Sequence, residues 1–123
     1  MRKILLVEDD EFIIDIYKQK LEQDGFSVEV AQDGEEALRK VKSIKPDLLI
    51  LDIVLPNIDG WEIIKSIKKD EELKGLKIIA LTNLKQKEDI KRGQSLGITG
   101  YFVKANYTPS QIVKEVKKIM EQF

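Results

Sequence analysis

Residues 48–52 read Leu48-Leu49-Ile50-Leu51-Asp52, an unbroken apolar run that ends in a carboxylate. A strand that is apolar at successive positions is covered on both faces, as in the middle of a parallel sheet. A lone carboxylate at the end of such a strand is expensive to bury without a partner. The stretch therefore predicts a central strand and makes Asp52 a candidate functional residue.

Short apolar runs recur on both sides of this stretch, and each has the length of a strand. Residues 27–30, Ser-Val-Glu-Val, alternate between polar and apolar, which is typical of an edge strand. The predicted strands cover residues 4–7, 28–31, 48–51, 78–81 and 101–103.

Helical patterns separate the strands, and several have clear start or stop signals. Thr108-Pro109-Ser110-Gln111 supplies an N-cap hydroxyl, a proline at the first helical position and a glutamine that can close a capping box. Asp33 and Asp59 are placed to cap two further helices, and Gly25 to close the first. The final helix carries one apolar stripe, formed by Ile112, Val113, Val116, Ile119, Met120 and Phe123.

Strands and helices alternate strictly along the chain. This order predicts an α/β fold with an open, doubly wound parallel sheet of five strands and five helices on its two faces. In such sheets the active crevice lies at the carboxyl ends of the strands. The residues that directly follow each strand are therefore the candidates for function.

The composition is that of a globular protein, and we expect residues 1–123 to form a single domain. Of the 123 residues, 42% are hydrophobic and 35% are charged. The net charge of -1 offers no basic surface for nucleic acid or an anionic membrane, so we expect neither as a direct partner. The residues before Glu8 are too few for a signal-peptide core or a membrane span, which predicts a soluble, cytoplasmic protein.

The chain has neither cysteine nor histidine, and both absences restrict its chemistry. Without cysteine, disulfides, thiolate nucleophiles and cysteine-bound metals are excluded. Without histidine, any imidazole base, ligand or phosphate carrier must come from another molecule.

Three acids, Glu8-Asp9-Asp10, follow the strand expected at 4–7, where a nucleotide-binding fold would place glycines. In the doubly wound topology this strand should lie beside strand 48–51, which brings Glu8 and Asp9 close to Asp52. A cluster of carboxylate oxygens without histidine or cysteine suits Mg²⁺. The alternatives are a solvated turn in which Asp10 caps the next helix, and a turn-capping role for Asp52.

A carboxylate beside Mg²⁺ can act as the nucleophile toward a phosphoryl group, and Asp52 is the candidate. The phosphoryl oxygens need further donors, which Thr82 and Lys104 supply from two other strand ends. Taken singly, Thr82 is more often a turn hydroxyl, Lys104 a surface charge and Tyr101 edge-strand packing rather than a switch. Their joint placement with Asp52 favours the functional interpretation.

These residues resemble the receiver domain of bacterial two-component response regulators, the CheY-like family, over essentially the whole chain. Residues 4–10 look like the family's first strand and acidic pair, and residues 51–60 look like its phospho-acceptor segment. Thr82 and Lys104 look like its remaining invariant positions. The resemblance implies a flavodoxin-like sheet of order 2-1-3-4-5 and a signalling phospho-acceptor rather than an enzyme.

The resemblance also implies a ligand set. Asp9 and Asp52 bind Mg²⁺ directly, with Mn²⁺ as a substitute, the main-chain carbonyl of Val54 is a third ligand, and Glu8 contributes through water. Asp52 takes the phosphoryl group, and Lys104 pairs with its oxygens.

A switch and partners follow from the same resemblance. Thr82 moves its hydroxyl toward the phosphoryl group, and Tyr101 turns inward. The donor is a histidine kinase or a histidine phosphotransfer protein, and the output partner binds the fourth helix (85–97), the fifth strand and the fifth helix. The protein is expected to be a monomer or a weak phosphorylation-dependent dimer. Gly93 in the fourth helix costs about 1 kcal/mol relative to alanine, so we expect this helix to be the least stable.

The chain departs from the family pattern at three places. Ala105 stands where a proline after a cis peptide is usual, and because a non-proline cis bond costs about 2.5–4 kcal/mol, the direction of Lys104 is left open. Asn83 replaces a smaller residue, which alters access to the site. Gly93, Leu96 and Ile98 replace alanines.

Several other classes share parts of the pattern. The main alternative is a pseudo-receiver, an interaction module that acts without phosphorylation. A metal-dependent phosphatase would need an Asp-x-Asp pair, whereas Asp52-Ile53-Val54 lacks the second acid. A flavin mononucleotide carrier would need hydroxyls and glycines where Glu8-Asp9-Asp10 stand.

Overall fold

The computed structural model describes residues 2–122. Its sheet has five parallel strands in the order β2-β1-β3-β4-β5, as the family resemblance implies. The strands are β1 (Lys3–Val7), β2 (Ser27–Ala31), β3 (Leu48–Leu51), β4 (Lys77–Thr82) and β5 (Gly100–Val103). The helices are α1 (Glu11–Gln23), α2 (Gly34–Ile44), α3 (Gly60–Lys69), α4 (Lys87–Ser95) and α5 (Pro109–Glu121), with a short 3₁₀ helix η1 (Lys104–Asn106) after β5.

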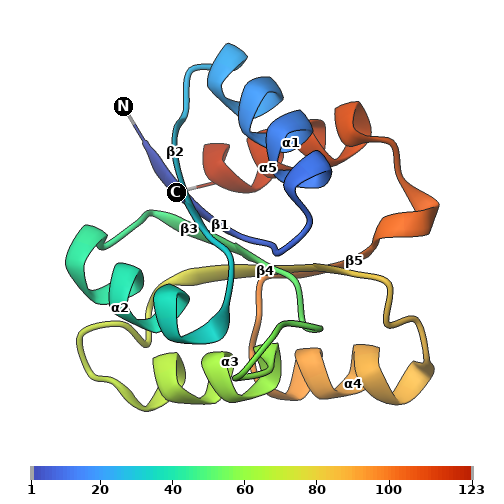
Figure 1. The fold of residues 1–123 in the computed structure, drawn as a ribbon. Coiled ribbons are helices and arrows are strands. Elements are labelled where there is room, and N and C mark those ends of the chain that lie inside the picture. The colour runs from blue at the N-terminus through green and yellow to red at the C-terminus, as the bar shows by residue number, and fades with distance from the viewer. Residues whose placement is uncertain (1, 123) are drawn as a thin grey trace.

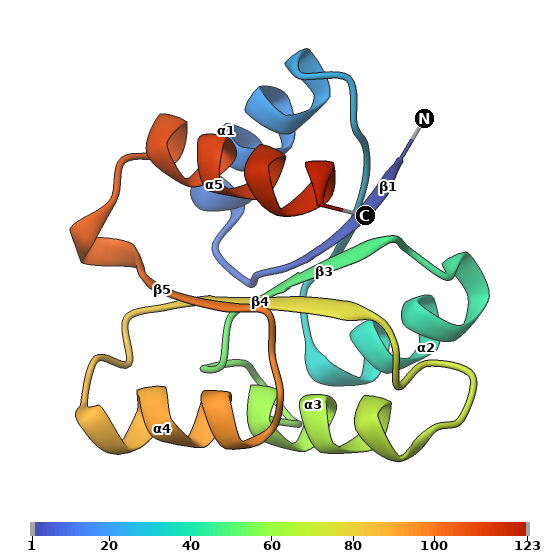
Figure 2. The ribbon, with the colours of Figure 1, turned by 180° about the vertical axis from the view of Figure 1, so that it is seen from behind.

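Two layers of helices cover the sheet. α1 and α5 lie together on one face, and α2, α3 and α4 cover the other, as Figures 1 and 2 show from opposite sides. Alternate residues of β1 enter different cores, because Ile4 and Leu6 join the core beneath α1 and α5 whereas Leu5 and Val7 join the opposite one. The inner strands are thus buried on both faces, which explains their unbroken apolar runs.

The predicted helix starts are confirmed. Asp33 accepts from the Glu36 amide at 2.8 Å and Asp59 from the Glu62 amide at 3.0 Å. At α5, Thr108 and Gln111 form the predicted capping box. The stripe that α5 buries consists of Ile112, Val113, Val116 and Met120, and Phe123, its last predicted member, lies outside the described residues.

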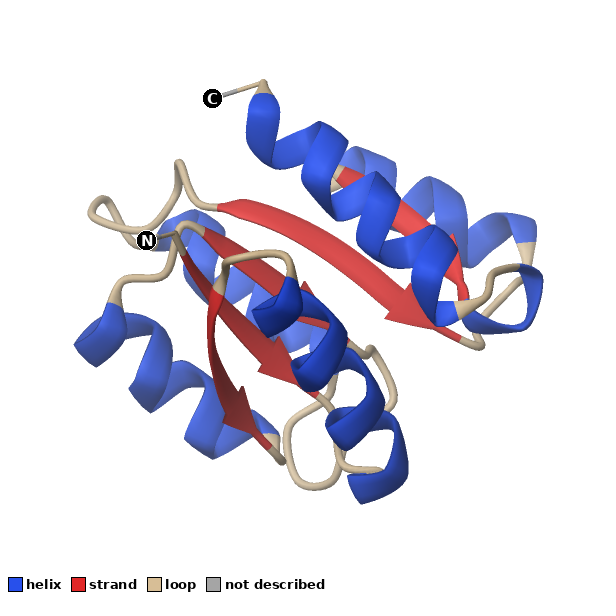
Figure 3. Cartoon of the chain, turned by 90° about the horizontal axis from the view of Figure 1, so that it is seen from above, coloured by secondary structure: helices blue, strands red, loops and turns tan. Residues whose placement is uncertain are grey.

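The parallel register brings the ends of the inner strands to one edge of the sheet, with the strand arrows of Figure 3 running in a common direction. Val7 lies opposite Leu51 across β1 and β3. Beyond the strands, the Asp52 amide donates to the Val7 carbonyl at 3.0 Å and the Glu8 amide to the Ala31 carbonyl at 3.0 Å. Glu8 and Asp52 therefore leave neighbouring strands at the same level.

α4 is attached to the molecule less firmly than α5. Gly93 is its one buried residue, and Gln86 at its N-cap makes no side-chain capping bond. A Cβ at Gly93 would lie 2.9 Å from Ile98 Cδ1 and 3.1 Å from Tyr101 Cδ2. Gly93 is therefore closely packed against Ile98 and Tyr101, so that a larger residue here would have to displace their side chains slightly.

No helix within residues 2–122 is long and apolar enough to cross a membrane.

The weak attachment of α4 predicts its exchange behaviour. Amides around Ile90 should exchange with solvent faster than those around Val116, because local opening of α4 exposes little apolar surface. Amide hydrogen exchange measured by NMR checks this expectation. Equal protection of the two helices would contradict it.

Candidate functional site

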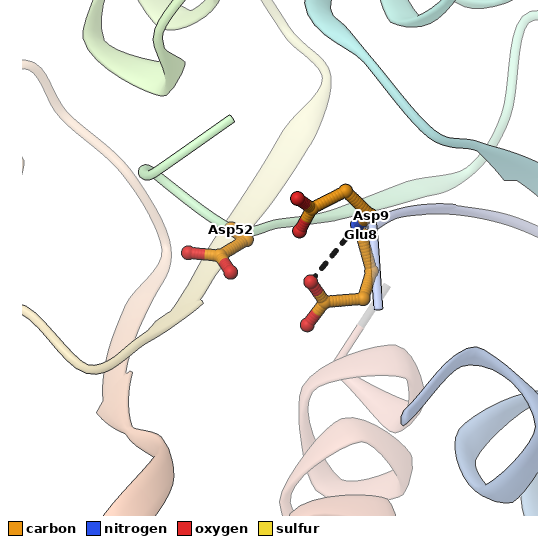
Figure 4. A group of neighbouring side chains, drawn as sticks. All are labelled: Glu8, Asp9 and Asp52. Atoms are coloured by element: carbon orange, nitrogen blue, oxygen red, sulfur yellow. Dashed lines mark hydrogen bonds between the residues drawn. The ribbon is translucent and has the colours of Figure 1, made fainter. Parts of the chain in front are cut away.

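An acidic cluster lies at the carboxyl end of the sheet. Carboxylate oxygens of Glu8, Asp9 and Asp52 all lie within 4.8 Å of one another. Figure 4 shows the three side chains directed toward a common space. Glu8 and Asp52 are buried, with 2% and 8% of their surfaces exposed, whereas Asp9 is exposed. The structure thus brings together the acids that the sequence places after β1 and β3.

Asp10 does not join this cluster. Its carboxylate accepts from the amides of Phe12 at 2.9 Å and Ile13 at 3.3 Å, and so caps α1. Of the three acids that follow β1, Asp10 is therefore the one that serves as a helix cap. The run Glu8-Asp9-Asp10 supplies two residues to the site and one to the helix that follows it.

Backbone amides fix the two buried carboxylates. Glu8 Oε2 accepts from the Asp9 amide at 3.0 Å, drawn as the dashed line in Figure 4. Asp52 Oδ1 accepts from the Val54 amide at 3.1 Å. Each carboxylate keeps its second oxygen for another partner.

Lys104 is that partner for both acids. Its ammonium donates to Asp52 Oδ2 at 2.8 Å and also to Glu8 Oε1. The peptide bonds of residues 2–122 are all trans, so Lys104 reaches the acids without a cis bond at Ala105. The η1 turn that begins at Lys104 supplies the change of direction instead.

The pKa values of this ion pair reflect burial and contact. Burial raises the pKa of the Glu8 carboxyl, against the lowering effect of its hydrogen bond from Lys104. Burial works to lower the pKa of Lys104, but the hydrogen bonds to Asp52 and Glu8 outweigh it and raise that pKa above its usual value. Both pKa values are therefore raised, that of Glu8 by burial and that of Lys104 by its hydrogen bonds to the two acids. Lys104 thus stays positively charged at neutral pH.

The site fits a hard divalent cation. Its ligand set contains oxygen atoms only, which suits Mg²⁺ or Mn²⁺ rather than a softer metal. If all three acids are ionised, Lys104 neutralises one and two negative charges remain. Val54 and Asn83 line the same cleft of about 330 Å³, so the Val54 segment borders the acids.

Thr82 and Tyr101 make their side-chain hydrogen bonds to the loop that follows β4 rather than to the acids. Thr82 is fully buried at the end of β4, and its hydroxyl lies 3.4 Å from the Leu84 amide. The Tyr101 hydroxyl donates to the Leu84 carbonyl at 2.6 Å. The backbone of Leu84 therefore connects both residues predicted to form a switch. The sequence gives no sign of this role, because main-chain atoms perform it.

The chain is similar to proteins of one family. A family model described as the response regulator receiver domain matches residues 4–117. The alkaline phosphatase synthesis transcriptional regulatory protein PhoP of Bacillus subtilis is 36% identical, and the match covers 98% of this chain and 49% of PhoP. The chain spans about half the length of several curated relatives that it matches.

Solved structures agree with this match. The chemotaxis response regulator CheY4 of Vibrio cholerae has a TM-score of 0.88 and 31% identity, covering 97% of this chain and 98% of that one. The Mn²⁺-bound form of response regulator Rcp1 has a TM-score of 0.83 and 25% identity, covering 97% and 91%. With its strand order and its family match in agreement, the chain belongs to the response regulator receiver domain family.

Proposed function

We propose that residues 1–123 act as one phosphoryl-accepting receiver domain, in which Asp52 takes the phosphoryl group from a phosphohistidine of a histidine kinase or a histidine phosphotransfer protein. One observation carries this proposal. Asp52, buried at the end of the central strand, shares the Lys104 ammonium with Glu8 and lies within ligand distance of Asp9. This arrangement combines a nucleophile, a fixed cation and room for a divalent metal.

The roles proposed for the residues are those that the family resemblance implies. Asp9, Asp52 and the Val54 carbonyl would hold Mg²⁺ or Mn²⁺, with Glu8 acting through water. When bound, the metal offsets the charge on the phosphoryl oxygens. An Asp52 carboxylate oxygen forms the new bond to phosphorus as the bond from phosphorus to the donor's histidine nitrogen breaks, and that nitrogen keeps the electron pair. Lys104 and Thr82 then donate to the phosphoryl oxygens, and they assist both transfer and later hydrolysis.

Intact mass after incubation with Mg²⁺ and acetyl phosphate tests this function. We expect wild type to gain one phosphoryl group and Asp52→Asn to gain none, because the amide lacks the nucleophilic carboxylate. A sample without metal should also gain none. If wild type gains nothing in the complete mixture, the pseudo-receiver interpretation replaces this proposal.

An apolar rim around the acids supports a protein donor. The exposed large hydrophobic residues among 2–122 are Phe12, Val54 and Tyr107, at 74%, 59% and 36% exposure. Phe12 and Tyr107 line an apolar hollow of about 190 Å³ that Lys104 also borders. Because Lys104 contacts Asp52, a protein delivering a phosphoryl group to Asp52 would approach close to this hollow. We therefore place donor docking on Phe12 and Tyr107.

Phe12→Ala separates docking from chemistry. The rate of transfer from a phosphorylated kinase or phosphotransfer protein that uses Asp52 should fall about tenfold, the effect expected for an aromatic contact at an interface. The rate with acetyl phosphate should stay unchanged, since this small donor does not touch Phe12. Gln19→Ala, an exposed change later in α1, is the matched control. An equal loss with both donors would contradict the docking role.

We propose that phosphorylation of Asp52 changes Thr82 and Tyr101, and that this change alters the binding of a protein partner. The partner binds the face formed by α4, β5 and α5, and the domain makes no direct contact with nucleic acid. Both residues bond to the Leu84 backbone, so a movement of Thr82 toward the phosphoryl group alters the acceptor of Tyr101. The ring of Tyr101 lies beside Gly93 of α4. Phosphorylation adds charge of roughly -1.5 to -2, which biases this connected set and can promote weak dimerisation.

Titration of Tyr101 reports its inward position. The pKa of Tyr101 is raised from 10.0 to about 12. The main cause is burial, and the negative charges of Asp89 and Asp52 add to it. The neutral phenol therefore contributes stability that is fully present below pH 10.0 and lost as the pH rises through about 12. The difference in tyrosinate absorbance between wild type and Tyr101→Phe should have a midpoint near 12, with circular dichroism recording the fold at each pH.

Gly93→Ala supplies the control for this titration. The new methyl group would lie 3.1 Å from Tyr101 Cδ2, which is closer than an ordinary contact, so it should displace the ring and lower the midpoint toward the ordinary value. A wild-type midpoint already at the ordinary value would contradict the inward position.

A further inference from the structure

The loop between β3 and α3 carries both Asp52 and Val54, and it is folded tightly. The Gly60 amide donates to the Ile53 carbonyl at 2.8 Å and the Ile58 amide to the Pro56 carbonyl at 2.9 Å. Asn57 adopts a left-handed conformation with φ of 70°. A displacement at one end of so short a loop is therefore passed to its other end.

The start of α2 packs closely against this loop. A Cβ at Gly34 would lie 2.5 Å from the Ile58 carbonyl oxygen and 2.6 Å from Ile58 Cβ. The carbonyl oxygen belongs to the backbone and Cβ is bonded directly to it, so no rotation of the Ile58 side chain could make room. In Figure 1 the start of α2 lies beside the segment that leads into α3. The hydrogen of Gly34 is the largest substituent that this contact accepts.

The start of α2 is held in place by its own hydrogen bonds and core contacts. Asp33 caps the Glu36 amide at 2.8 Å, and Glu36 in turn accepts from the Gln32 amide at 2.7 Å. Ala37 and Val41 anchor the helix in the core with no exposed surface. A side chain at position 34 would therefore move the loop rather than the helix.

We propose that Gly34 is a positioning residue for the metal site, because its contact with Ile58 sets where the loop places the Val54 carbonyl relative to Asp52. This inference rests on the proposed function, in which that carbonyl is a ligand. Mg²⁺ requires near-octahedral geometry at short oxygen distances, whereas Ca²⁺ accepts longer and more irregular ones. A small displacement of the loop consequently weakens Mg²⁺ binding more than Ca²⁺ binding.

Calorimetric titration with Mg²⁺ and with Ca²⁺ tests the inference. Gly34→Ala should raise the dissociation constant for Mg²⁺ about tenfold, the usual effect of disturbing a residue that orients a ligand, with a smaller change for Ca²⁺. Ile58→Gly removes the Cβ that faces Gly34 without creating a clash, and it should weaken Mg²⁺ binding in the same direction. This second variant keeps the test available if Gly34→Ala does not fold.

Two controls separate positioning from stability. Gly75→Ala introduces the same methyl group where no atom lies within 4 Å, and it should leave both affinities unchanged. Val41→Ala destabilises α2 by a core truncation away from the loop, so it should lower the melting temperature and leave the Mg²⁺ affinity unchanged.

Three results would overturn the inference. The first is a Mg²⁺ affinity of Gly34→Ala equal to that of wild type. The second is a loss with Val41→Ala as large as the loss with Gly34→Ala, and the third is an equal loss for Mg²⁺ and Ca²⁺. If wild type binds Mg²⁺ and any of these results is found, the inference alone fails, whereas a wild type that binds no Mg²⁺ overturns the metal site of the proposed function.

Discussion

Charge balance at the carboxyl end of the sheet is the constraint on which the other features depend. The parallel register of β1 and β3 forces Glu8 and Asp52 together, and both are buried there. Like charges at that depth destabilise the fold unless a cation lies between them. Lys104 provides that cation from the end of β5. The last strand of the sheet is thereby tied to the acids that follow the first and third.

The same contact makes the end of β5 sensitive to the charge at Asp52. Lys104 directly follows the strand that carries Tyr101, and Tyr101 bonds to the loop that begins at Thr82. The Tyr101 ring in turn lies against Gly93 of α4. Physical contacts are thus contiguous from the acidic site to α4, as energetic coupling between two places in a protein requires.

The strands and most helix starts were predictable because they depend on local patterns, such as the run 48–51 and the Thr108 cap, whereas the order of the strands was implied by the family resemblance. The acidic cluster was predictable from topology alone. The role of Asp10 as a helix cap was among the alternatives that the sequence offered, because its bonds are local. Two features were not predictable, since each depends on tertiary contact: Leu84 acts through main-chain atoms, and the contact between Gly34 and Ile58 joins distant segments.

α4 illustrates how low stability and function are combined. Glycine at position 93 costs about 1 kcal/mol in a helix, yet alanine there would make a tight contact with Tyr101. α4 is joined to α3 by surface contacts: Arg92 lies 4.7 Å from the Trp61 ring centre, and Lys68 donates to the Gly97 carbonyl at 3.2 Å. An exposed cation–π contact contributes only about 0.5–1 kcal/mol. α4 is thus held by contacts of that size, whereas α5 is fixed by four buried anchors and a capping box, so α4 is the helix that a small change in free energy displaces more readily.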